Sequence, residues 1–312
     1  SYALLQNASL DVALNDTVPE DTSTEKSRWK IALARLHVVN TSAHVHMPGD
    51  TLAVRCVLGD AVARNGQFDL EPQHFSLSRL DLKKGKICYD NKYAKPEAAG
   101  LDVNHLALNA LAIRVDSFFY SPERLTMGIS KFSFREKCGF CLSDMSCRVL
   151  MDTARLNIPS LSIVTPASRM QAKLAMDLNA FADTLPGSLS ANLNARLGFA
   201  DMAALLPYVK PYVSRMPYAF IDVKGEMKGN MQKAHVPVFS LQIPGAMTAR
   251  ADGWLQNLTD IDRLKGHLAF AVRTQQIDAI RRVLPAETAA SFRLPSGMAL
   301  DGKVAFDGAQ YN

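Results

Sequence analysis

The sequence lacks most of the features that mark specialised protein classes. Its 312 residues include five cysteines, and an odd number cannot form a complete set of intrachain disulfides. Lys and Arg total 35 against 30 Asp and Glu, a net charge of +5 without a basic block, so no nucleic-acid-binding arm is indicated. The longest stretch free of these charged residues, 234–249, contains two prolines and is shorter than the about 20 apolar residues that a membrane-spanning helix needs.

Motifs that carry catalytic chemistry are missing as well. The chain contains no G-x-S-x-G, no H-E-x-x-H, no glycine-rich phosphate loop and no dinucleotide-binding fingerprint. A hydrolase built on strands therefore has no residues to support it. We expect a protein that is not an enzyme, that needs no cofactor and that binds no nucleic acid.

Two short patterns resemble metal or redox sites without completing one. Cys138-Gly139-Phe140-Cys141 is a C-x-x-C pair followed by Cys147, but no second pair of ligands follows at zinc-site spacing. The pair also lies in strand-like sequence, whereas a redox C-x-x-C opens a helix, so we interpret these cysteines as small apolar strand residues. His44-Val45-His46 would place two imidazoles on one face of a strand, and two ligands alone do not make a metal site.

The dominant feature of the sequence is an alternation of apolar and polar residues with a period of two. It is clearest in 170–179, 189–197, 264–272 and 298–306. A strand turns successive side chains to opposite faces, so each segment has one apolar side, as in antiparallel sheets. Further strands are predicted at 29–39, 51–58, 75–82, 86–91, 101–115, 127–135, 139–145, 146–151, 155–163, 218–227, 236–242 and 245–255.

Only short segments have helical spacing. Asp201 is expected to cap a helix through Leu206 that Pro207 keeps short. Residues 276–284 form a second candidate and Ser121–Leu125 a weaker third. The alternation therefore predicts an all-β fold of antiparallel strands with two or three short interrupting helices. We expect residues 1–312 to be one continuous segment of a longer protein, with a sub-boundary near 200–217.

So many one-sided strands need a partner layer, and the short helices are too few to supply it. Three arrangements remain open. The sheet can close into a filled barrel, or two sheets can face each other as a sandwich. Alternatively, the sheet curls into a trough whose inner face stays apolar and takes an apolar ligand.

Several segments resemble the AsmA/TamB superfamily. The sequence Leu-Asn-Ile-Pro-Ser-Leu-Ser-Ile-Val-Thr-Pro-Ala-Ser at 156–168 is similar to the family's "apolar-x-x-Leu-x-Ile-x-Thr-Pro-x-Ser" step. Residues 135–146 look like its "E-x-x-Gly-apolar-x-apolar-x-x-Leu-Ser" step, although cysteines stand where the pattern has small or apolar residues. The segments 201–207 and 277–285 look like the family's short interrupting helices, and 294–302 followed by 308–311 is similar to TamB-like proteins of Bacteroidetes type. The resemblance as a whole spans roughly residues 28–312.

The resemblance implies that the strands form a long curled antiparallel β-sheet, with residues 1–312 as one continuous β-groove segment. This taco-shaped groove with an apolar lining is known in the family as a β-taco. It implies a non-enzymatic lipid-transfer conduit that shields phospholipid acyl chains between the inner and outer membranes and so supports outer-membrane biogenesis in the cell envelope. The location implied is the periplasm, within a protein whose inner-membrane anchor lies outside this segment. An outer-membrane assembly partner would be contacted through regions that also lie outside it.

The apolar faces of the clearest strands give a set of residues predicted to line the groove and bind lipid. They are Leu106, Leu108, Ile113, Ile129, Met170, Leu174, Met176, Leu178, Leu193, Leu197, Leu268 and Phe270. The alternative function is a β-rich scaffold that assists the assembly or secretion of outer-membrane proteins by pairing a sheet edge with a client strand. An apolar trough open along its length would favour lipid, and a packed, dry sandwich would favour the scaffold.

Overall fold

The structure is a computed structural model that describes residues 1–13, 29–46, 52–182, 184–214, 216, 219–275, 297–308 and 310–311. Strands make up 70% and helices 6% of these residues, which confirms the all-β prediction. The chain divides into two compact units, Ser1–Asp152 and Thr153–Asn312, and the sub-boundary expected near 200–217 falls inside the second. The helix predicted at 276–284 lies outside the described residues. None of the described helices has the length and apolar character needed to cross a membrane.

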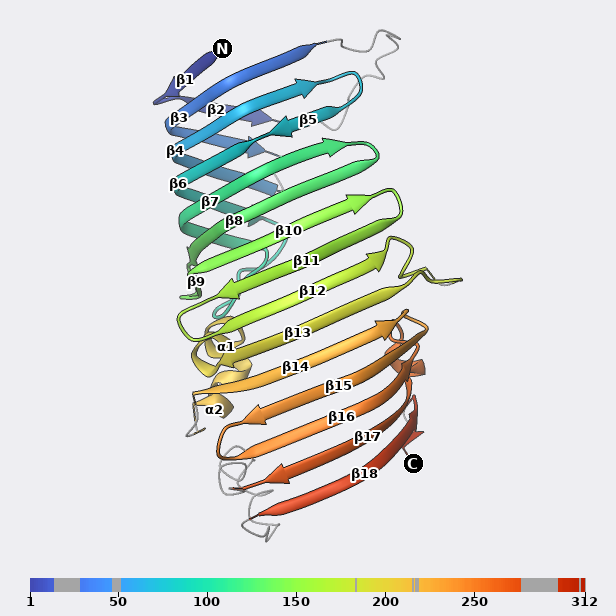
Figure 1. Ribbon diagram of the computed structural model, residues 1–312. Coiled ribbons are helices and arrows are strands. Elements are labelled where there is room, and N and C mark those ends of the chain that lie inside the picture. The colour runs from blue at the N-terminus through green and yellow to red at the C-terminus, as the bar shows by residue number, and fades with distance from the viewer. Residues whose placement is uncertain are drawn as a thin grey trace. The chain divides into compact units, whose positions relative to one another are not determined.

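The first unit contains long strands that pair antiparallel with their neighbours in chain order (Figure 1). Its strands are β1 (Tyr2–Gln6), β2 (Ser9–Ala13), β3 (Lys30–His46), β4 (Leu52–Asp69), β5 (His74–Leu77), β6 (Arg79–Asn91), β7 (His105–Ser121), β8 (Arg124–Glu136), β9 (Cys141–Leu142) and β10 (Asp144–Asp152). The short strands β5 and β9 pair with only part of a longer neighbour. The strand predicted at 75–82 is divided between the end of β5 and the start of β6, and the one predicted at 86–91 is the second half of β6.

Strands β1 and β2 are an exception to the predicted antiparallel arrangement. Both run parallel to β3, with Tyr2 opposite Arg35 and Ser9 opposite Ser42. The sheet of the first unit is therefore mixed at this edge. Alternation along a segment identifies a strand, but it does not identify the partner or the direction of pairing, which depend on distant residues.

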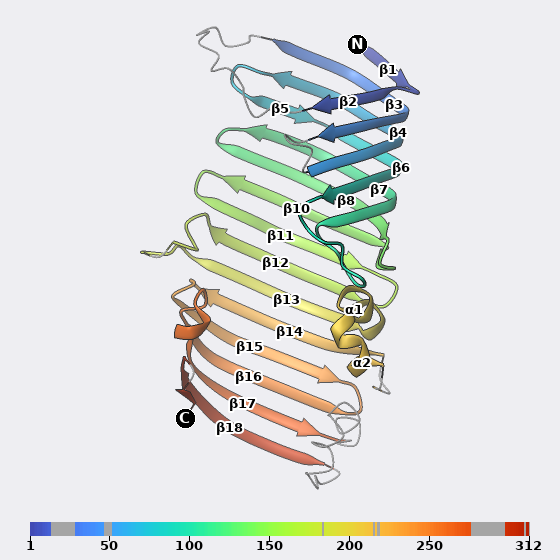
Figure 2. The same ribbon diagram turned by 180° about the vertical axis from the view of Figure 1, so that it is seen from behind.

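A line of residues in the left-handed conformation crosses the first unit and bends its strands. Asn7, Asn40, Lys84 and Ala110 have φ values of 53°, 46°, 56° and 52°. Regular pairing is interrupted at Asn40 and Gly59, and again beside Lys84 and Ala110. Irregularities of this kind bend a strand locally, so the long strands turn back and present two limbs one behind the other (Figures 1 and 2).

The inside of this bend is filled by apolar side chains. Val38, Ala61, Leu82 and Leu111 form the buried cluster, and Leu111 has no exposed surface. The first three are consecutive partners across β3, β4 and β6, and Leu82 in turn pairs with Ile113 on β7. Leu58 and Ile87, beyond the bend, pack against the same cluster. The first unit therefore packs the inner faces of its own strands together where they bend.

The second unit is an antiparallel meander in which each strand pairs with the next (Figure 1). Its strands are β11 (Arg155–Val164), β12 (Arg169–Asp177), β13 (Leu189–Gly198), β14 (Phe220–Gly229), β15 (Lys233–Ile243), β16 (Met247–Gln256), β17 (Lys265–Thr274), β18 (Met298–Asp307) and β19 (Gln310–Tyr311). Between β13 and β14 the chain forms α1 (Phe199–Leu205), a 3₁₀ turn (Pro207–Val209) and α2 (Lys210–Val213), and a further 3₁₀ turn (Ile261–Arg263) precedes β17.

Two helix predictions need correction. Residues 121–125 form no helix, because Ser121 pairs with Arg124 to close the tight turn between β7 and β8, and the long ladder beyond it outweighs a local helical preference. The helix at 199–205 exists, but Asp201 lies in its first turn and does not cap it. Gly198 occupies the N-cap position and makes no side-chain cap.

The Thr-Pro-x-Ser sequence forms the turn between β11 and β12 and also holds α1. The amide of Ser168 donates to Oγ1 of Thr165 at 2.7 Å, and the amide of Thr165 donates to the carbonyl of Ser168 at 3.0 Å. Both hydroxyl groups donate to the Asp201 carboxylate on α1. Asp201 therefore fastens the start of the helix to the neighbouring turn.

The close approach of β16 and β17 predicts that Gly253 cannot be replaced. Its φ is +148°, and a Cβ there would lie 2.0 Å from the carbonyl oxygen of His267. We expect Gly253→Ala to lower the free energy of unfolding by about 1–3 kcal/mol, measured by thermal or urea unfolding. Gly225→Ala is the matched control, because a Cβ at Gly225 would have no neighbour nearer than Phe239 Cδ2 at 3.9 Å. Equal stability losses in the two variants would contradict this explanation.

Candidate functional site

The second unit carries an apolar face that extends in register across eight consecutive strands. One row runs through Leu161, Ala172, Leu193, Gly225, Phe239, Ala251, Phe270 and Gly302, and a second through Ile163, Met170, Ala195, Val223, Leu241, Ala249, Val272 and Leu300. A third begins at Leu156 and Met176 and ends at Gly266 and Phe306. Alternate residues of a strand share a face, so these rows, together with Ile158, Leu174, Leu268 and Val304 between them, make one surface, called here the apolar face.

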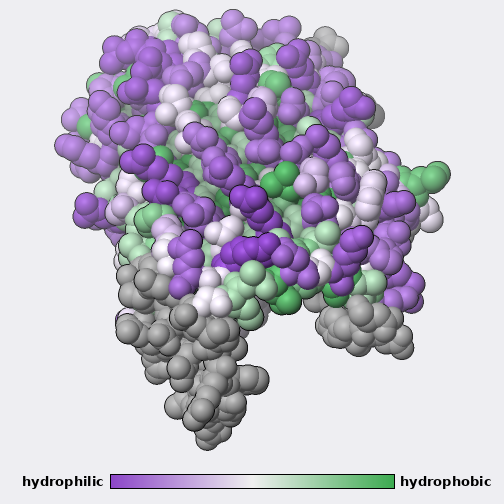
Figure 3. Space-filling view, turned by 60° about the horizontal axis from the view of Figure 1, so that its bottom comes forward, coloured by the Kyte–Doolittle hydropathy of each residue, from purple (hydrophilic) through white to green (hydrophobic). Residues whose placement is uncertain are grey.

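The opposite face of the same strands is polar. It carries ion pairs between neighbouring strands or residues, with atoms 2.6–3.0 Å apart: Arg155–Asp177, Arg196–Asp222, Lys228–Glu226, Lys265–Asp307 and Arg273–Asp301. Exposed pairs of this kind add little stability, but they keep this face compatible with water. In the space-filling view hydrophilic side chains predominate on the visible surface, with hydrophobic ones in patches between them (Figure 3).

The apolar face is only partly covered within the described residues. Among the described residues of the second unit, the buried apolar side chains are those of Leu189, Phe199, Ile243 and four alanines. The larger side chains of the rows remain partly accessible, and Phe239 and Leu300 are 40% and 48% exposed. The described apolar side chains thus form a single layer that no second sheet covers, unlike the inner face of a sandwich.

Two aromatic rings lie over glycines of a neighbouring strand on the apolar face. A Cβ at Gly266 would meet the Phe306 ring at 2.4 Å, and one at Gly302 would meet the Phe270 ring at 2.8 Å. The glycines therefore make room for rings that lie against the sheet. This arrangement gives β17 and β18 apolar contact surface where the backbone would otherwise be bare.

Seven of the predicted lining residues lie on the apolar face. They are Met170, Leu174, Met176, Leu193, Leu197, Leu268 and Phe270. Leu178 lies elsewhere, past the end of β12 in a turn, where it is 45% exposed and its amide donates to the carbonyl of Ala154. The alternation in the sequence continues to Leu178, but the ladder ends one residue earlier.

The other four predicted lining residues belong to the first unit. Ile113 packs against the buried cluster of Val38, Ala61, Leu82 and Leu111. Ile129 pairs with Val115, which is itself buried, and Leu108 pairs with Ile87. Leu106 borders a cavity beside His105. These four residues are therefore parts of the packed interior of the first unit or of its margin, and they do not belong to the apolar face defined above.

The list of predicted lining residues includes none from β11, β14, β15, β16 or β18, although each of these five strands contributes to the apolar face. Examples are Ile158, Val223, Leu241 and Val304. The same alternation could have identified them, because the strands at 155–163, 218–227 and 236–242 were predicted. The bulge in β15 between Val236 and Phe239 could not have been located in this way, because it shifts the alternation by one residue.

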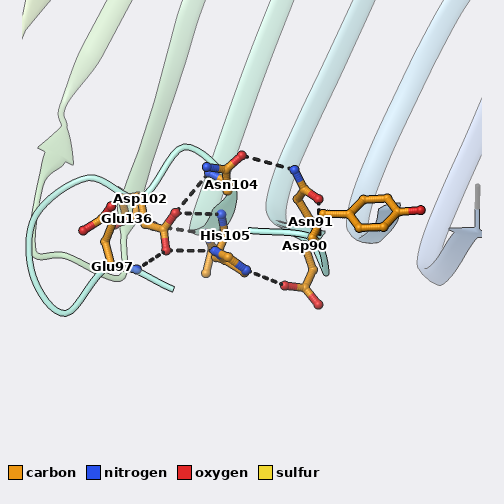
Figure 4. A network of polar contacts seen from close by, with 9 residues as sticks. Asp90, Asn91, Glu97, Asp102, Asn104, His105 and Glu136 are labelled. Atoms are coloured by element: carbon orange, nitrogen blue, oxygen red, sulfur yellow. Dashed lines mark hydrogen bonds and ion pairs between the residues drawn. The ribbon is translucent and has the colours of Figure 1, made fainter. Parts of the chain in front are cut away.

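A polar network closes the end of the first unit around the loop between β6 and β7 (Figure 4). Asp102 is 1% exposed and its carboxylate accepts hydrogen bonds from the amides of Glu97 and Asn104 at 3.0 and 3.1 Å. Nδ1 of His105 lies 2.9 Å from the same carboxylate, and Nε2 lies 3.5 Å from Asp90. Both imidazole nitrogens therefore face carboxylates, which suits an anchor for the loop.

The pKa of Asp102 follows from these contacts. Burial favours the neutral acid, but the hydrogen bonds from Glu97, Asn104 and His105 outweigh it and lower the pKa of Asp102 below its ordinary value. Glu136 is similar: its carboxylate accepts from the amides of Ala107 and Cys138, and its pKa is lowered against the effect of burial. The folded chain therefore stabilises the ionised forms of Asp102 and Glu136.

The cysteines are unpaired, with Cys88 exposed and the other four half-buried. All five thiols are free. Burial raises the pKa of Cys138, with a further contribution from the neighbouring Glu136 carboxylate, and burial raises the pKa of Cys147. Both thiols are held in the protonated, weakly nucleophilic form. Cys147 lies on β10, as predicted for a strand residue, whereas Cys138 lies in the turn after β8, so the strand prediction is wrong there.

The comparisons with known proteins add no relative. No family model, no curated protein and no solved structure matches the chain.

The lowered pKa of Asp102 predicts a pH-dependent contribution to stability. The pKa of an aspartate in the unfolded chain is about 3.9. Because the folded pKa is lower, the contribution is fully present above the unfolded value and is lost as the pH falls through the folded pKa. We expect Asp102→Asn to lower the melting temperature at about pH 7 and the difference from the wild type to shrink towards about pH 3. Equal melting temperatures at neutral pH would contradict the anchoring role.

Proposed function

We propose that the apolar face of the second unit binds the acyl chains of phospholipids and that the chain is a segment of a non-enzymatic lipid-transfer conduit. The observation that carries this proposal is the register: apolar residues or glycines occupy the same face of eight consecutive strands. A core would bury such a surface, whereas most of its described large side chains remain accessible. Extended exposed apolar surfaces mark binding sites for apolar partners.

The energetics of lipid transfer favour this kind of surface. Each methylene of an acyl chain exposed to water costs about 0.8 kcal/mol, so a lipid crossing an aqueous space needs a continuous apolar contact. Strands of ten residues, such as β13 and β14, span about 33 Å. That length is comparable with the hydrocarbon thickness of a whole bilayer, about 30 Å, and accommodates a single extended acyl chain.

The sheet also meets the hydrogen-bonding requirement of a lipid-facing surface. Backbone amides and carbonyls cannot be left without partners against hydrocarbon. From β12 to β17 each strand pairs with a neighbour on both sides, so the ladders satisfy these groups. The charged opposite face keeps the segment stable in water. No bond is made or broken in such a transfer, and no catalytic group is required.

We place this activity in the periplasm, between the inner and outer membranes, where it would support outer-membrane biogenesis. The resemblance of residues 28–312 to the AsmA/TamB superfamily supports this setting. An inner-membrane anchor and contacts with an outer-membrane assembly partner would belong to regions outside this segment. The alternative function, a scaffold that pairs a sheet edge with a client strand, would give the apolar face no role in binding.

Adjacent positions on one strand give a direct test. A photo-crosslinking residue at Leu193 would lie on the apolar face, whereas one at Asn192 would lie on the polar face of the same strand. Leu174 and Lys173 form a second pair on β12. We expect irradiation in cells to attach phospholipid at Leu193 and Leu174, detected by mass spectrometry of the purified protein, with little or none at Asn192 and Lys173.

The same experiment distinguishes the two functions. Lipid adducts that appear equally at the apolar-face positions and at the polar-face positions would indicate non-specific contact and would contradict the proposal. Protein adducts at all four positions without lipid would favour the scaffold. Thermal unfolding of each variant checks that the inserted side chain has not disrupted the sheet.

A further inference from the structure

The first unit brings a third potential metal ligand to the two histidines that the sequence places on one strand. His44 and His46 are two residues apart on β3, and their rings lie side by side with centroids 3.7 Å apart. The parallel strand β2 sets Asp11 directly opposite His44. Among the described residues, Asp11, His44 and His46 form the one group of three His, Cys, Asp or Glu side chains whose ligand atoms all lie within 4.8 Å of one another.

We propose that Asp11, His44 and His46 bind a divalent transition-metal ion, with Zn²⁺ as the best fit. Nε2 of His46 lies 3.3 Å from Oδ1 of Asp11, and Nδ1 of His44 lies 3.8 Å from Oδ2. Two ligand atoms at about 2.0 Å from a tetrahedral ion are about 3.3 Å apart. The three groups are therefore close to coordination geometry and need only small side-chain rotations. Imidazole and carboxylate ligands suit Zn²⁺ and its neighbours in the first transition series.

A fourth coordination position is open to solvent. His44 and His46 border a cavity of about 330 Å³, which is also lined by Arg55, Asp90 and His105. Water from this cavity can complete a three-ligand site, as in zinc sites that keep one position free. The ion would join β2 to β3 across the parallel edge of the sheet, where five residue pairs of the described chain connect the two strands.

Arg55 competes with the ion in the metal-free protein. Its Nε donates to Nε2 of His44 at 3.1 Å, which requires an unprotonated Nε2 and leaves the proton on Nδ1. Binding of a metal through Nδ1 moves that proton to Nε2 and removes the acceptor of Arg55. The guanidinium also adds a positive charge beside the ion. Removal of Arg55 should therefore tighten metal binding. If Arg55 instead supported the bound ion, its removal would weaken binding.

Titration of the tag-free protein with Zn²⁺ tests the site independently of the lipid proposal. We expect isothermal titration calorimetry to show one ion bound per chain. We expect His44→Gln, His46→Gln and Asp11→Asn each to weaken binding by about tenfold or more. Arg55→Gln should strengthen binding severalfold. Zn²⁺ should raise the melting temperature of the wild type, because a ligand that binds the folded state stabilises it, and should leave that of the double histidine variant unchanged.

His37→Gln is the matched control. His37 lies on the same strand and pairs with the carboxylate of Asp60 at 2.8 Å, so its loss should leave Zn²⁺ affinity unchanged. Melting temperatures without metal show whether each variant is folded. Wild-type affinity equal to that of the double variant His44→Gln/His46→Gln would overturn the proposal, as would weaker binding in Arg55→Gln.

Discussion

The register of the strands is the constraint on which the rest of the structure depends. The side chains of a strand alternate with a period of two, so a slip of one residue would move a whole apolar row to the polar side. Across β11–β18 the pairs stay in register, apart from bulges such as the one between Val236 and Phe239. Apolar residues therefore meet apolar residues on one side, and ion pairs such as Arg196–Asp222 form on the other.

The two units use the same one-sided strands differently. In the first unit, residues in the left-handed conformation such as Asn40 and Ala110 bend the strands. The buried cluster of Val38, Ala61, Leu82 and Leu111 fills the inside of this bend. In the second unit the strands lie in a simple meander, and the described part of the chain supplies no second layer over most of the apolar face. The first unit thus buries the inner surface of its strands, whereas the second leaves most of the large side chains of its apolar face accessible.

Much of the fold could be predicted from the sequence because alternation is a local property. The strands at 170–179 and 189–197 were located to within a few residues, and seven of twelve predicted lining residues share the apolar face of the second unit. Pairing between distant segments could not be predicted. Nothing near Asp11 indicates that it lies opposite His44, since that contact depends on parallel pairing of β2 with β3.

The sequence also could not show where a strand bends or ends. Leu178 continues the alternation of β12, but the carboxylate of Asp177 accepts hydrogen bonds from the amide and hydroxyl of Ser188 and fixes the turn at that point. Asn40 belongs to a residue type that tolerates the left-handed conformation, but nothing in its local sequence marks Ala110 as a position with positive φ. Likewise, Asp201 is a residue type that often caps helices, but its carboxylate accepts hydrogen bonds from the hydroxyl groups of Thr165 and Ser168.

The central claim is that the apolar face of the second unit is a binding surface and not one half of a dry core. Native mass spectrometry of the protein purified without detergent tests it most directly, followed by solvent extraction and lipid analysis of the same sample. The account predicts species heavier than the polypeptide by the mass of phospholipids, which extraction removes and identifies. Bare polypeptide, with no lipid in the extract and no uptake from added phospholipid vesicles, would contradict it.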